Sequence, residues 1–97
     1  MIEVVANSLR VSGPMVIANA TALLQQGRQL LTQPSAGGVS AVDLASVAEV
    51  DSSALSVLFG WLRTARSAGI DLRVINSPAS MLSLAALYGV ADSLPLA

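Results

Sequence analysis

Residues 39–75, VSAVDLASVAEVDSSALSVLFGWLRTARSAGIDLRVI, decide the fold because helix-like and strand-like patterns alternate along them. In residues 39–47, the apolar Val39, Ala41 and Val42 precede Asp43. This pattern is typical of a central strand. The run 53–69 has the length of a helix, and 70–75 returns to strand alternation. A strand, a helix and a second strand in this order predict parallel strands joined by a crossover helix.

The residues before this stretch predict a hairpin followed by a helix. The β-branched runs 2–5 and 9–15 are separated by a turn-type interruption, so we expect an antiparallel hairpin. From Val16 the apolar residues recur three or four apart, which indicates a helix. Its expected apolar face holds Ile17, Ala20, Leu23, Leu24, Gly27, Leu30 and Leu31. We interpret Gly27 as a point where another backbone approaches closely.

A third short helix is expected after the last strand. Ser77 is a plausible cap, Pro78 its first residue and Gly89 its stop. Leu94 and Leu96 in the tail are expected to add an edge contact. Alternating strands and helices in 97 residues predict one α/β domain over residues 1–97.

The composition excludes several classes of protein. Hydrophobic residues make up 54% of the chain and charged residues 11%, which excludes disorder and leaves some apolar surface exposed. A net charge of −1, with five Arg and no Lys, argues against nucleic acid as a partner. Cysteine and histidine are absent, so thiolate, serine-histidine and zinc chemistries are excluded. We therefore expect no enzyme, no metal and no cofactor.

The first ten residues lack the basic start and the long apolar run of a signal peptide. The longest apolar runs are also shorter than a membrane span. The expectation from these two features is a cytoplasmic, soluble protein.

The residues EVDSSAL, 49–55, could cap a helix, or the same residues could also form a site that binds a partner or is modified. Asp51, Ser52 and Ser53 are residue types that accept hydrogen bonds from the free N–H groups of a helix start. The same free N–H groups and the positive potential there would also favour a phosphate or an acidic side chain. The two interpretations are compatible.

The helix that follows has apolar residues on two faces. Leu55, Leu58, Leu62 and Ala65 share one face, and Ala54, Val57 and Trp61 share a second face that is expected to turn partly away from the core. Trp61 is the only Trp of the chain, and we consider a core position and a role as a binding anchor equally well supported by the sequence. Asp43 and Asp71 are interpreted as solvated charges at strand ends and not as a catalytic pair.

Residues 42–75 resemble the central signature of STAS domains, in which a strand ending in Asp-Leu is followed by a loop and by Asp-Ser/Thr-Ser/Ala-Gly-Leu at a helix start. The stretches 50–69 and 84–96 are most similar to the MlaB-type STAS subunits of the ABC systems that maintain outer-membrane phospholipid asymmetry. The resemblance implies an α/β STAS-like sandwich with a mixed sheet of about four to five strands and helices packed on it.

The resemblance also implies a role for Ser52. The hydroxyl directly after the signature Asp is phosphorylated in anti-sigma factor antagonists and faces the partner in the transporter subunit. Two positions depart from the family pattern: Ala54 replaces the usual Gly, and the acids of a Gly-Glu-Leu-Asp pattern are missing at 13–16. Both departures favour simple docking over a kinase switch.

Three functions remain open at this point. The first is a non-catalytic module that binds the ATPase subunit of a phospholipid-transporting ABC system and is peripheral at the inner membrane through that complex. The second is an anti-sigma factor antagonist controlled by a kinase at Ser52. The third is a domain that binds a nucleotide or another small ligand. The expected partner-binding or phosphorylation residues are Asp51, Ser52, Ser53, Ala54, Val57 and Trp61, and a homodimer is an alternative partner arrangement.

Overall fold

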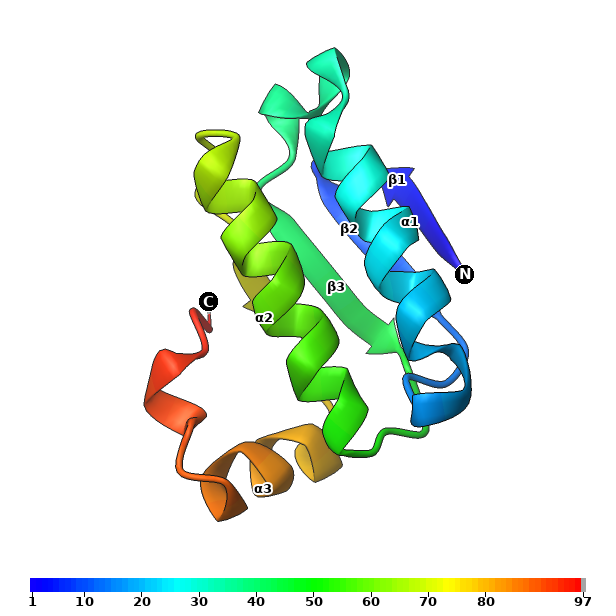
Figure 1. The fold of residues 1–97 in the computed structure, drawn as a ribbon, viewed down its shortest axis with the longest axis vertical. Coiled ribbons are helices and arrows are strands. Elements are labelled where there is room, and N and C mark those ends of the chain that lie inside the picture. The colour runs from blue at the N-terminus through cyan, green and yellow to red at the C-terminus, as the bar shows by residue number, and fades with distance from the viewer. Residues whose placement is uncertain (97) are drawn as a thin grey trace.

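The computed structural model describes residues 1–96, except for the side chains of residues 34 and 35, and shows one four-stranded sheet (Figure 1). The strands, in their order across the sheet, are β1 (Ile2–Val5), β2 (Ser8–Ser12), β3 (Ala41–Ser46) and β4 (Arg73–Ile75). β1 pairs antiparallel with β2, whereas the pairs β2–β3 and β3–β4 are parallel. The predicted hairpin and mixed sheet are confirmed.

Three helices accompany the sheet: α1 (Ala20–Thr32), α2 (Ser52–Ser67) and α3 (Ala79–Leu87). α1 connects β2 to β3 and α2 connects β3 to β4, and Figure 1 shows these two helices side by side on the same face of the sheet. α3 lies beyond the end where α2 begins. Among residues 1–96, no helix has both the length and the hydrophobicity needed to cross a membrane.

The contact between α1 and α2 is built around Gly27 and Trp61. A Cβ atom added at Gly27 would overlap atoms of the indole ring of Trp61, so only glycine leaves room for the ring in this position. The indole Nε1 donates to the carbonyl oxygens of Leu23 (3.2 Å) and Leu24 (3.1 Å), which satisfies the one polar atom of a fully buried side chain. A close approach at Gly27 is present, but the group that approaches is the side chain of Trp61 and not a backbone as predicted.

The last strand is shorter than predicted. Residues 70–75 alternate as expected, with Leu72 and Val74 buried and Asp71 and Arg73 exposed, but β4 covers only Arg73–Ile75. The N–H of Ile70 donates to the carbonyl oxygen of Ala65 (2.8 Å), because the left-handed Gly69 turns the chain back at the end of α2.

The predicted start of the third helix is also corrected. Pro78 is the cap residue of α3, and the Ser77 hydroxyl has no hydrogen-bond partner among the described residues. Gly89, at φ 70°, follows the helix end as expected. The tail adds the predicted edge contact, since Leu94 is buried and Leu96 pairs with Val74 in an isolated parallel bridge.

Candidate functional site

Asp51 caps α2 and also holds a second segment of the chain. One carboxylate oxygen, Oδ1, accepts from the N–H of Ser53 (2.8 Å), which confirms the predicted cap. The other, Oδ2, accepts from the N–H of Ile17 (2.9 Å), 34 residues earlier. The bond from Ile17 lowers the pKa of Asp51 most, partial burial opposes this, and the bond from Ser53 lowers the pKa further. Asp51 is therefore an ionised structural acid.

Ile17 is exposed to solvent in a segment whose backbone is held by hydrogen bonds to the Asn19 side chain. The Asn19 side chain accepts from the N–H of Val16 (3.0 Å) and donates to the carbonyl oxygen of Pro14 (2.8 Å). Ile17 begins a 3₁₀ turn, Ile17–Asn19, and its side chain is 76% exposed. The expected place of Ile17 on the buried face of the first helix is wrong, because the α-helical period starts only at Ala20.

The three serines at the start of α2 differ in exposure. Ser52 is the first residue of the helix and is exposed, and Ser53 is half-buried. Ser56 is exposed one turn later. Because residues four apart lie on the same face of a helix, the hydroxyls of Ser52 and Ser56 form a polar strip on the outside of α2.

The expected outward face made by Ala54, Val57 and Trp61 is wrong. The side chains of these three residues are buried, and Trp61 has no exposed surface at all. Leu58 on the leucine face is equally buried. α2 has apolar residues on two sides because one side packs on the sheet and the other on α1. These three side chains therefore pack within the fold and do not form the exposed face that was expected of them.

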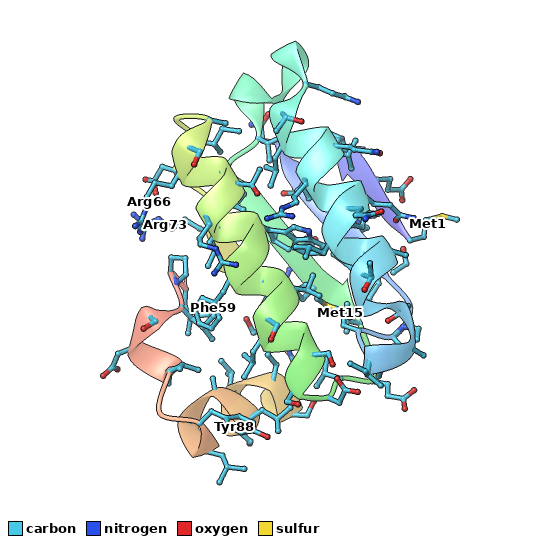
Figure 2. All side chains as sticks on the ribbon, in the orientation of Figure 1. Met1, Met15, Phe59, Arg66, Arg73 and Tyr88 are labelled. Carbon is cyan, nitrogen blue, oxygen red and sulfur yellow. The ribbon has the colours of Figure 1, made fainter. Side chains whose placement is uncertain are left out.

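Two shallow hollows flank the serines. One, of about 350 Å³, is lined by Ser52, Ser53, Leu55, Ser56, Phe59, Tyr88 and Val90. The other, of about 190 Å³, is lined by Ile17, Ala20, Thr21, Leu24, Ser53, Ser56 and Val57. Tyr88, at the end of α3, is 57% exposed, and Figure 2 labels it below Phe59 near the start of α2. The serines thus lie between two partly apolar depressions.

Asp43 and Asp71 do not form a catalytic pair. Asp71 is exposed and lies 3.4 Å from Arg73, whereas Asp43 is only 9% exposed, so its expected place as a solvated charge is wrong. The Asn76 amide (3.0 Å) and the Ala45 N–H (2.9 Å) donate to Asp43 Oδ1.

These two hydrogen bonds, that from Asn76 first, lower the pKa of Asp43 against the effect of burial, and Arg10 adds to the lowering. Both carboxylate oxygens of Asp43 therefore interact within the fold, since Oδ2 lies 3.9 Å from the Nε of Arg10. Within residues 1–96, no cluster of three or more acidic side chains could hold a metal ion.

Sequence reasoning missed the apolar residues that surround the serines. Phe59 and Tyr88 are the only Phe and Tyr of the chain, which is a signal that could have singled them out. Ile17 gave no such signal, because its exposure depends on a hydrogen bond from a residue far along the sequence.

Comparison with known proteins connects this geometry to a family. The family model described as "Mlab, STAS domain" matches residues 2–96. No curated protein matches the chain. The fold is similar to the anti-sigma factor antagonist SpoIIAA in its unphosphorylated form, with a TM-score of 0.62 and 16% identity over 87% of this chain and 78% of the other. It is also similar to the Bacillus cell fate determinant SpoIIAA in the phosphorylated form, with a TM-score of 0.66 and 16% identity over 100% of this chain and 89% of the other.

Proposed function

Because this chain belongs to the MlaB-type STAS domain family, we propose that it is a non-catalytic docking subunit for the ATPase of a phospholipid-transporting ABC system. The observation that carries the proposal is the exposed Ser52–Ser56 strip between two partly apolar hollows at the start of α2. In this proposal the protein is cytoplasmic and is held at the inner membrane through the transporter complex.

The exposed apolar side chains around the strip support docking. Ile17 stands on one side and Tyr88 on the other, and both are mostly exposed. Tyr is enriched among residues that dominate binding energies, and serine hydroxyls between such residues supply adaptable hydrogen bonds. The cap of Asp51 holds both Ile17 and the first turn of α2, so this docking surface is ordered before a partner arrives.

The side chains present also support a non-catalytic role. The chain has no His and no Cys. Asp51 accepts two backbone N–H groups, so its carboxylate is committed to the fold and not placed as a base for Ser52. The exposed hydroxyls of Ser52 and Ser56 are available for contact, and within residues 1–96 neither is hydrogen-bonded to a side chain that could activate it as a nucleophile.

Titration with a candidate ATPase subunit of a phospholipid-transporting ABC system tests the proposal. Ser52→Arg places a bulky cation in the docking surface and is expected to weaken binding roughly tenfold or more, as at interface centres. Ser40→Arg is the matched control, because Ser40 is exposed and precedes β3 at the opposite end of that strand. Equal affinity of wild type and Ser52→Arg would rule out this surface.

A second candidate function is an anti-sigma factor antagonist switched by phosphorylation of Ser52. The observation that favours it is the exposed hydroxyl at the first position of α2, in a fold that resembles both forms of SpoIIAA. Phosphorylation would add about −1.5 to −2 charges beside the ionised Asp51 and change the docking surface. Incubation with the cognate serine kinase and mass spectrometry tests this, with Ser53→Ala and Ser56→Ala as controls; a phosphate found elsewhere than Ser52 would contradict it.

A further inference from the structure

The strip formed by Ser52 and Ser56 continues along the outer side of α2 toward the end of the helix. Ser52, Ser56, Phe59, Arg63 and Ser67 follow one another at helical spacing, and all are exposed or half-buried. The rise of an α-helix places Arg63 about 16 Å from Ser52 along the axis. The hollow beside the serines and a second one share Phe59, and that second hollow also includes Arg63. The docking surface therefore extends along the helix without a break.

The far end of the strip opens into a larger hollow between the last turns of α1 and α2. Its volume is about 610 Å³. Arg28 and Arg63 line it from the two helices, and Thr32, Thr64 and Ser67 add hydroxyl groups. Leu31 and Ala36, both buried, form apolar parts of its lining.

Within residues 1–96, Arg28, Arg63 and Arg66 have no acid within ion-pair distance, and of these three only Arg28 and Arg63 line the larger hollow. Arg10 and Arg73 each lie within 4.0 Å of an aspartate, whereas among residues 1–96 no carboxylate lies that close to Arg28 or Arg63. Arg28 Nε donates to the Thr64 hydroxyl, at 3.3 Å. In a chain of net charge −1, this hollow is a local concentration of positive charge.

A simpler role for both arginines is to offset the negative end of each helix dipole. Arg28 and Arg63 each lie four residues before the end of their helix, just before its last turn, and the basic residue in the last turn of α2 is Arg66. That role requires only a position near the helix end. It does not explain why guanidinium groups from two helices and three hydroxyl groups line the same hollow.

We propose that Arg28 and Arg63 bind an acidic, carboxylate-bearing segment of the same ATPase partner. This inference rests on the proposed function, since the hollow continues the docking surface at the start of α2. The guanidinium group of arginine can donate two parallel hydrogen bonds to one carboxylate. A phosphate fits less well, because the hollow lies at two helix C-terminal ends, whose carbonyl groups repel a doubly charged anion.

The salt dependence of ATPase binding tests the inference. The double variant Arg28→Gln/Arg63→Gln is expected to bind the ATPase roughly tenfold more weakly at low salt and to lose most of the wild-type weakening at high salt. Arg73→Gln is the matched control, because Arg73 is exposed and paired with Asp71 on another element. Arg63→Lys keeps the charge and should retain the salt dependence. Thermal unfolding of every variant checks that the fold is intact.

The outcomes separate this inference from its premise. Absence of binding by the wild-type protein would overturn both. If Ser52→Arg weakens binding while the double arginine variant retains wild-type affinity and salt dependence, only the acidic-segment inference fails. It also fails if the double variant binds the ATPase normally but, unlike wild type, no longer sediments with vesicles of anionic phospholipid, because the occupant would then be a membrane surface.

Discussion

One carboxylate, that of Asp51, joins two segments that are distant in the sequence. Its hydrogen bond to Ser53 follows from local capping chemistry and could be predicted from the order of the residues. Its bond to Ile17 could not, because that contact exists only after β2 and β3 have paired and brought Met15 beside Val50. The predictable half of the site is the half that is local in sequence.

The double role of Asp51 predicts a specific pattern of amide exchange. In Asp51→Ala, the N–H groups of both Ile17 and Ser53 lose their acceptor, so both should exchange faster with solvent. Asp51→Asn keeps a single acceptor oxygen and should protect only one of the two. Hydrogen exchange followed by NMR measures this. Unchanged protection of Ile17 in Asp51→Ala would show that the bond is not formed in solution.

At the level of elements, α2 shows why apolar periodicity alone gave the wrong orientation for the face of Ala54, Val57 and Trp61. An exposed face and a face packed on a neighbouring helix look the same in sequence when both are apolar. Trp61 faces α1 because Gly27 leaves room for its ring, and this pairing of a large and a small residue spans two helices. The surface of α2 consists instead of serines, Phe59 and arginines, which a search for apolar stripes passes over.

Filling the space at Gly27 should separate α1 from α2. Gly27→Val puts methyl groups into the Trp61 ring and is expected to lower the free energy of unfolding by about 1–3 kcal/mol, the usual cost of overpacking. Gly37→Val is the control, since a Cβ there meets no atom within 4 Å, and should change stability by less than about 0.5 kcal/mol. Chemical denaturation measures both. Equal stability of the two variants would contradict the tight contact.

At the scale of the whole molecule, the sequence predicted the order of elements along the chain, the antiparallel hairpin and the parallel later strands. Strand and helix periods are properties of single segments, and the handedness of parallel crossovers limits how such segments assemble. The environment of Asp43 could not be obtained in this way. It depends on Arg10 in the preceding strand of the sheet and on Asn76 after the next one, so it emerges only from the pairing of three strands.

Asp43 and Asp51 together predict an acid limit to stability. Both carboxyl groups have a pKa below the usual 3.8 in the folded state, so the folded protein binds fewer protons than the unfolded chain. Their stabilising contribution is therefore complete above about pH 3.8 and is lost as the pH falls through the folded values. Urea denaturation between pH 2 and pH 6 should show this loss. Asp43→Asn/Asp51→Asn should flatten the curve in that range; an equally steep curve would contradict the assignment.

Because Trp61 is buried, its fluorescence reports whether α1 and α2 are packed together. It is the single indole of the chain and is sealed between α1 and α2, so its emission should shift to longer wavelength only when these two helices come apart. Tyr88 lies mostly in solvent on the docking surface. A partner that covers Tyr88 should therefore leave the Trp61 spectrum almost unchanged, so that one fluorescence measurement distinguishes docking from unfolding.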